Sequence, residues 1–172
     1  MKAALPVLSL VLLFYISPAQ AQEDCACCSV KHSEFDFWLG DWEVFTTENK
    51  KLGENTIVKL ERDCIVQEHW RGESGITGRS FNYFDPSDGT WNQLWLDSGG
   101  SSLKLKGRFR DGSMVLQSGL TRGKKIDWYY DRITYTKIDE NTVSQLWEIL
   151  DSNEQRVTVA FHGVYRRKAN NP

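Results

Sequence analysis

The sequence lacks a second long apolar run. Its one run covers residues 3–16 behind Lys2 and is followed by an Ala-Gln-Ala tripeptide that ends at Ala21. This order predicts a secretory signal peptide over residues 1–21. The run is shorter than the ~20 apolar residues that a membrane-spanning helix needs. A lipoprotein would carry its cysteine directly after the run, and Cys25 stands too far downstream. We therefore predict a protein that is secreted or periplasmic, without a membrane anchor.

The sequence also lacks an excess of charge of either sign. It has 21 Lys plus Arg against 23 Asp plus Glu, a balance of −2 that provides no attractive field for nucleic acid. Removal of the signal peptide leaves 151 of the 172 residues, the size of one domain with one core. No repeat, low-complexity tract or linker is visible. We predict a Cys-rich segment over 22–32, one domain over 33–168 and a short tail over 169–172.

Several catalytic signatures are missing as well. The sequence has no nucleophile-elbow glycines in a Ser-His-Asp order, no HExxH and no phosphate-cradling loop, which disfavours triad hydrolysis, metalloprotease chemistry and nucleotide use. A second Cys-x-x-Cys pair is absent too, so a zinc site that combines the clustered thiols with His32 is the weaker interpretation of the cysteines. We predict no metal and no cofactor.

The cysteines that are present suggest a disulfide. Cys25, Cys27 and Cys28 are clustered, and Cys64 stands alone. In an oxidising compartment this distribution favours a bond between Cys64 and one of the three. Four cysteines allow three full pairings, and the sequence does not choose among them.

Downstream of a short predicted helix over 33–39, the chain has strand character throughout. Turn signals such as Asp85-Pro86-Ser87-Asp88-Gly89 and Asp111-Gly112 separate the strands. With no crossover helix, this pattern predicts an all-β meander that closes into an antiparallel barrel of roughly ten strands, with room inside for one small ligand. A two-sheet sandwich is the alternative. The predicted strands cover 42–46, 55–61, 64–70, 78–84, 90–97, 102–110, 113–120, 125–137, 142–150 and 155–167.

Alternation along these strands places tryptophans beside polar groups. Side chains two residues apart share a face, so Trp95 lies with Gln93 and Trp147 lies with Gln145. Aromatic walls with a few polar groups are typical of a binding cavity. In the competing interpretation these faces point outward, and their polar neighbours are solvated. The predicted ligand-binding residues are Trp70, Asn82, Gln93, Trp95, Asp97, Tyr130, Gln145 and Trp147.

Extended motifs resemble a known family. Residues 35–42 (FDFWLGDW), 68–72 (EHWRG), 80–86 (SFNYFDP), 145–148 (QLWE) and 161–167 (FHGVYRR) are similar to those of short bacterial proteins catalogued as a domain of unknown function. Members look like calycins, the barrel group of the lipocalins, and the Gly40-x-Trp42 pair resembles the calycin signature that closes one barrel end. The resemblance implies a barrel and no particular activity. The family commonly carries an acidic residue at the position of His162.

Some calycin barrels isomerise, hydrate or dehydrate a ligand without a cofactor, which requires only an acid, a base and a dry pocket. We therefore predict a dehydratase-type lyase that acts on a carbohydrate or sugar-acid oligosaccharide fragment. Tryptophan suits sugar faces, and arginine suits a carboxylate. The alternative is a non-catalytic, lipocalin-like carrier of a small amphipathic or aromatic ligand. The predicted catalytic residues are His69, His162, Glu68 and Arg132, with one histidine at the rim of the pocket.

Overall fold

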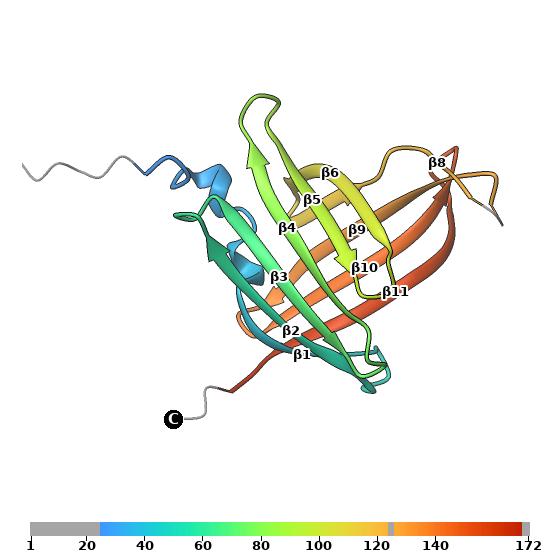
Figure 1. Cartoon of the computed structure of the whole chain (residues 1–172), viewed down its shortest axis with the longest axis horizontal. Coiled ribbons are helices and arrows are strands. Elements are labelled where there is room, and N and C mark those ends of the chain that lie inside the picture. Colours follow the sequence, from blue (N-terminus) through green and yellow to red (C-terminus); the bar gives the residue numbers. More distant parts are fainter. Residues whose placement is uncertain (1–24, 124–125, 170–172) are drawn as a thin grey trace, which may run out of the picture.

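The computed structural model describes residues 25–123 and 126–169, which form a closed antiparallel β-barrel (Figure 1). The predicted signal peptide and residues 170–172 of the predicted tail lie outside the described residues. The strands are β1 (Gly40–Phe45), β2 (Lys51–Leu60), β3 (Ile65–Gly72), β4 (Thr77–Asp85), β5 (Thr90–Asp97), β6 (Ser102–Arg110), β7 (Ser113–Gln117), β8 (Thr121–Arg122), β9 (Trp128–Asp139), β10 (Thr142–Asp151) and β11 (Arg156–Arg167).

The sheet closes because every long strand has two antiparallel neighbours. Strands β1 to β7 pair in chain order, β9 pairs with β7 and β10, and β11 pairs with β10 and β1. This closure confirms the predicted meander barrel and excludes the two-sheet sandwich. The short β8 is an additional strand that pairs only with the start of β9, where β7 has already ended.

The turns follow the predicted chemistry. Asp111 and Gly112 have φ of 50° and 76°, as a two-residue type I′ hairpin requires. Gly89 has φ of 67°, and its N–H donates to the main-chain oxygen of Asp85 at 2.9 Å. Local sequence therefore determines where these strands end.

The predicted helix over 33–39 is replaced by two short 3₁₀-helices, η1 (Val30–Ser33) and η2 (Asp36–Trp38). Both lie at one end of the barrel, in blue in Figure 1. Phe35 and Trp38 are fully buried there and stack with their ring centroids 4.9 Å apart. Packing of these rings into the barrel, rather than helix propensity, determines the local conformation.

Trp42 closes the same end, as predicted. Its side chain is fully buried, and its indole N–H donates to the main-chain oxygen of Trp38 at 2.9 Å. The guanidinium of Arg167 lies over the ring, 4.2 Å from the centroid. The interior at this end is therefore filled by protein side chains.

Two disulfides hold the residues that precede η1. Cys27 pairs with Cys64, which directly precedes β3, and Cys25 pairs with Cys28. The predicted bond between Cys64 and the N-terminal cluster is confirmed, and Cys27 is its partner. All four thiols are thus engaged in disulfides, which removes the cysteines as zinc ligands.

Candidate functional site

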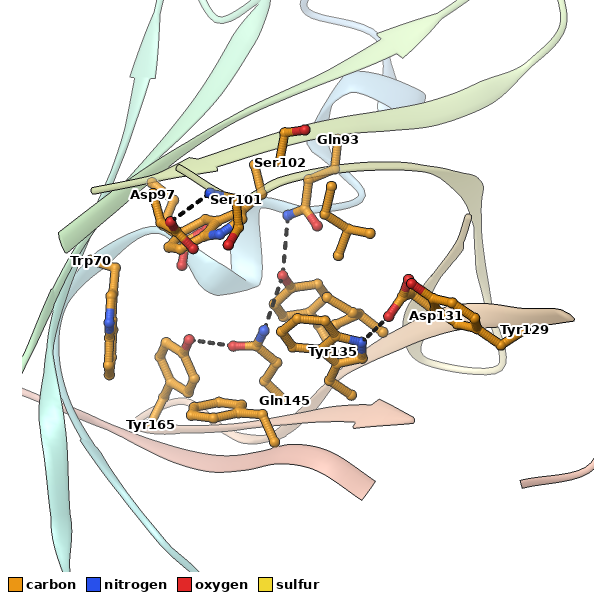
Figure 2. Close-up of a pocket in the computed structure, with 16 residues that line it drawn as sticks. Trp70, Gln93, Asp97, Ser101, Ser102, Tyr129, Asp131, Tyr135, Gln145 and Tyr165 are labelled. Atoms are coloured by element: carbon orange, nitrogen blue, oxygen red, sulfur yellow. Dashed lines mark hydrogen bonds between the residues drawn. The ribbon is translucent and has the colours of Figure 1, made fainter. Parts of the chain in front are cut away.

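The half of the barrel away from the 3₁₀-helices encloses a cavity of about 350 Å³. This volume lies within the range of roughly 300–1,000 Å³ that is usual for small-ligand sites. Figure 2 shows the side chains that line it. The lining consists of Glu68, Trp70, Gln93, Trp95, Asp97, Ser101, Ser102, Leu103, Tyr129, Asp131, Ile133, Tyr135, Gln145, Trp147, Phe161 and Tyr165.

The walls of the cavity are aromatic. Trp70, Trp95 and Trp147 come from β3, β5 and β10, and Phe161 from β11 lies with its ring at right angles to Trp70, 6.3 Å between centroids. Large flat rings offer apolar area and π-faces to a ligand. Since the opposite end of the barrel is filled by buried side chains, the empty space inside the barrel lies between these rings.

A closed ring of hydrogen-bonded side chains forms the polar floor, and we call it the polar ring. Its eight members come from seven strands, and each bonds to the next around the barrel. In order they are Asn55, Glu68, Ser80, Asn82, Gln93, Tyr135, Gln145 and Tyr165. Buried polar groups that bond to one another in this way restrict the floor to few arrangements, and Asn55 Oδ1 is the buried oxygen of the polar ring that has no partner among the described residues.

Glu68 is the acid of the polar ring. The residue is only 4 % exposed. Its two carboxylate oxygens accept hydrogen bonds from Asn55 Nδ2 at 2.6 Å and from Ser80 Oγ at 2.7 Å. Burial raises the pKa of this carboxyl from the ordinary 4.5 to about 7, although the two hydrogen bonds oppose the rise. Glu68 therefore titrates near neutral pH.

Two tyrosines complete the floor. Burial and the nearby Glu68 carboxyl raise the pKa of Tyr135 and of Tyr165 well above 10, so both phenols keep their protons. The Tyr135 hydroxyl accepts from Gln93 Nε2 at 3.1 Å and from Gln145 Nε2 at 3.4 Å (Figure 2). Its own proton has no acceptor among the hydrogen bonds of the described residues. Tyr135 can therefore donate to a ligand in the cavity.

Two aspartates lie nearer the open end. Asp131, on β9, is only 6 % exposed, and its Oδ1 accepts from Trp147 Nε1 at 2.8 Å. Burial raises the pKa of the Asp131 carboxyl. Asp97, at the end of β5, accepts from the N–H groups of Gly99 and Ser101 at 2.9 and 3.0 Å. These main-chain donors lower the pKa of Asp97, so its charge is retained.

Six of the eight predicted ligand-binding residues line the cavity, together with the predicted catalytic acid Glu68. Asn82 lies directly behind the lining, where its amide contacts Gln93 and Ser80 in the polar ring. The six are Trp70, Gln93, Trp95, Asp97, Gln145 and Trp147.

The predicted position of the histidines is wrong. His69 alternates with the inward Glu68 and Trp70, so it lies on the outer face of β3, with Nδ1 3.2 Å from Arg71 Nη1. His162 likewise lies outside on β11, with Nε2 3.2 Å from Ser144 Oγ. Neither lines the cavity, so a ligand bound there is out of their reach.

The predicted positions of Arg132 and Tyr130 are also wrong, because neither residue lines the cavity. Arg132 lies on the outer face of β9, where its guanidinium donates to Gln117 at 2.8 Å and to Glu154 at 2.5 Å. Tyr130 shares that outer face. The inward residues of β9 are the alternate ones, Tyr129, Asp131, Ile133 and Tyr135.

These alternate residues are part of the site that sequence reasoning missed, together with Phe161 and Tyr165 of β11 and with residues 101–103 at the start of β6. The sequence of β9 does contain a signal for the inward face. Ile133 is an aliphatic residue of the kind that is usually buried, and Asp131, two positions away, lies on the same face. The predicted Tyr130 and Arg132 share their face with Trp128, which is 46 % exposed.

In comparisons with known proteins, no family model and no curated sequence matches this chain. Among the described residues, no group of His, Cys, Asp or Glu side chains is arranged to hold a metal ion. The same residues contain no helix with the length and apolar character needed to cross a membrane. The cavity and the polar ring are therefore the features on which a function can be argued.

Proposed function

We propose that this protein is a non-catalytic carrier that binds a small molecule with a flat apolar body inside the barrel. The observation that carries the proposal is the combination of aromatic walls with a floor in which most of the polar groups already bond to one another. Both oxygens of Glu68 accept hydrogen bonds within the polar ring. The polar ring therefore holds the shape of the cavity, and the rings of Trp70, Trp95 and Trp147 supply the contact area for the ligand.

We also propose that the protein acts after export. The predicted signal peptide and the two disulfides agree with an oxidising compartment, such as the periplasm or the extracellular medium. We keep the similarity to the calycin-like bacterial family as part of the proposal, since a calycin-type carrier would combine a packed end with an open one.

A neutral fluorescent probe tests the carrier. N-phenyl-1-naphthylamine is flat, apolar and uncharged at neutral pH, and its emission rises when it leaves water. We expect saturable binding with a micromolar dissociation constant, and a loss of roughly tenfold or more in Trp95→Ala or Trp147→Ala. Trp128→Ala is the matched control, because Trp128 is 46 % exposed on the outer face and should not affect binding. Absence of saturable binding would overturn the proposal.

A cofactor-free lyase is the second candidate, and one observation favours it. Glu68 lines the cavity and has a pKa of about 7, the range suited to general acid–base catalysis. The described residues of the lining include no basic side chain to hold a uronic carboxylate, so neutral oligosaccharides are the better substrates to test. Mass spectrometry would detect loss of one water. Turnover that disappears in Glu68→Gln, while the probe still binds, would establish the lyase.

A further inference from the structure

The charge of the cavity is one-sided. Among the described residues, its lining contains the three carboxyl groups of Glu68, Asp97 and Asp131 and no lysine, arginine or histidine. We infer that the ligand is a small organic cation, an ammonium group attached to a flat apolar body, and that Asp131 is its counter-ion. This inference rests on the carrier function proposed above and names the chemical class of the ligand.

Asp131 is the carboxylate with capacity left for a ligand. Its Oδ1 accepts from Trp147, and no hydrogen bond to its Oδ2 occurs among the described residues. No lysine, arginine or histidine among the described residues forms an ion pair with Asp131. A buried carboxylate without a cation is unfavourable, and the raised pKa of Asp131 reflects this cost. An ammonium bound at Oδ2 would remove the cost.

The other two acids differ from Asp131 in their surroundings. Asp97 is only half-buried, and its Oδ1 accepts two main-chain N–H groups in the turn between β5 and β6, so its charge is already stabilised and adds negative potential at the mouth of the cavity. Glu68 is held at both oxygens by Asn55 and Ser80. Asp131 is therefore the buried acid that keeps a carboxylate oxygen for a ligand.

The aromatic walls suit the same ligand. The π-face of tryptophan attracts a cation, most strongly where water is excluded. Trp147 is oriented by its bond to Asp131, so the acid and one aromatic wall form a single unit. An anion in the same place would meet three carboxyl groups with no compensating base among the described lining residues, which selects against it.

Three probes of nearly equal shape test the inference by isothermal titration calorimetry at pH 7.5. They are 2-phenylethylammonium, the neutral 2-phenylethanol and the anionic 3-phenylpropanoate. We expect the ammonium to bind roughly 10- to 100-fold more tightly than the alcohol, as a charge-assisted hydrogen bond provides, and the propanoate to bind most weakly.

Asp131→Asn separates charge from shape. The asparagine oxygen can still accept from Trp147, so the indole keeps its place, while the negative charge is lost. We expect the preference for the ammonium over the alcohol to fall to within about threefold. Asp139→Asn, at the other end of β9, makes the same change in net charge and should leave the preference intact.

The outcomes distinguish the two proposals. Equal affinities for the ammonium and the alcohol would overturn the cation inference and leave the carrier standing. Failure of all three probes, and of the naphthylamine probe, would overturn both. A loss of affinity in Asp131→Asn that is equal for ammonium and alcohol would show that Asp131 only positions Trp147, and the counter-ion role would fall.

Discussion

The indole N–H of Trp42 donates to the main-chain oxygen of Trp38 across 2.9 Å, inside the closed end of the barrel. Trp38 belongs to η2 and Trp42 to β1, so the bond joins the 3₁₀-helix that fills this end to the first strand of the barrel. The guanidinium of Arg167, at the end of β11, covers the same indole. The side chain of Trp42, on the first strand, therefore contacts both η2 and the last strand.

Loss of this ring should be costly. We expect Trp42→Ala to lower the free energy of unfolding by about 3–5 kcal/mol, because it leaves a large cavity in a fully buried site. Trp42→Phe should cost less, since it keeps most of the volume and removes only the donor to Trp38. Urea denaturation measures both. Trp128→Ala is the control and should cost under ~1 kcal/mol; an equally small loss in Trp42→Ala would contradict the burial of the ring.

Stability should depend on pH through Glu68. The pKa of its carboxyl is about 7 in the folded protein against an ordinary 4.5, so between these values the folded state binds more protons than the unfolded state. Stability from this group is therefore full below pH 4.5 and is lost as the pH rises through 7, a fall of roughly 3 kcal/mol. The groups that face Glu68 are Asn55, Ser80 and the protonated phenols of Tyr135 and Tyr165.

Glu68→Gln should remove this dependence. The glutamine oxygen can accept from Asn55, and the Ser80 hydroxyl can turn to accept from the new amide. We expect the variant to exceed the wild type in stability at pH 8 and to lose that advantage by pH 4, measured by thermal unfolding across the range. Subtraction of the two curves cancels the contribution of other acids with a shifted pKa, such as the half-buried Glu54. A difference that stays constant with pH would show that folding does not raise the pKa of Glu68.

How far the sequence predicted this site depended on the contrast between the two faces of each strand. In β5 and β10, one face carries tryptophan with an amide and the other carries leucines, so the inward faces were assigned correctly. In β9 both faces are aromatic, with Trp128 and Tyr130 on one and Tyr129 and Tyr135 on the other. Period-two alternation does not choose between faces of similar composition.

The polar ring could not have been predicted from the sequence. Asn55 and Tyr165 are in contact at 3.2 Å but are 110 residues apart, and their contact exists only because the sheet closes between β11 and β1. The strands, turns and the bond of Cys64 to the N-terminal cluster follow from local patterns. Contacts across the interior require the register of every pair of neighbouring strands.

The disulfide between Cys27 and Cys64 should stabilise the fold. It spans a sequence separation of 37 residues, and constraint of a loop of that length in the unfolded chain is worth about 2–4 kcal/mol. We expect Cys27→Ser/Cys64→Ser to lower the melting temperature measurably. Cys25→Ser/Cys28→Ser is the control, because a separation of three residues constrains little. Equal losses in the two double variants would show that the effect does not arise from loop closure.

Gly78 makes room for a wall of the cavity. It lies on the inner face of β4, and a Cβ at this position would stand 2.3 Å from Cη2 and Cζ2 of Trp95. In Gly78→Ala the indole of Trp95 must therefore shift into the space that a ligand would occupy. We expect affinity for the naphthylamine probe to fall by roughly tenfold and the free energy of unfolding to fall by about 1–3 kcal/mol, as in overpacked cores.

Gly119→Ala provides the comparison for this change, because a Cβ at Gly119 would meet no atom within 4 Å. Fluorescence titration and urea denaturation should both leave that variant close to the wild type. If Gly78→Ala lowers stability but binds the probe with unchanged affinity, the ring of Trp95 yields without narrowing the cavity. Trp95 would then lie beside the bound molecule without forming its wall, and the aromatic surface for binding would reduce to Trp70, Trp147 and Phe161.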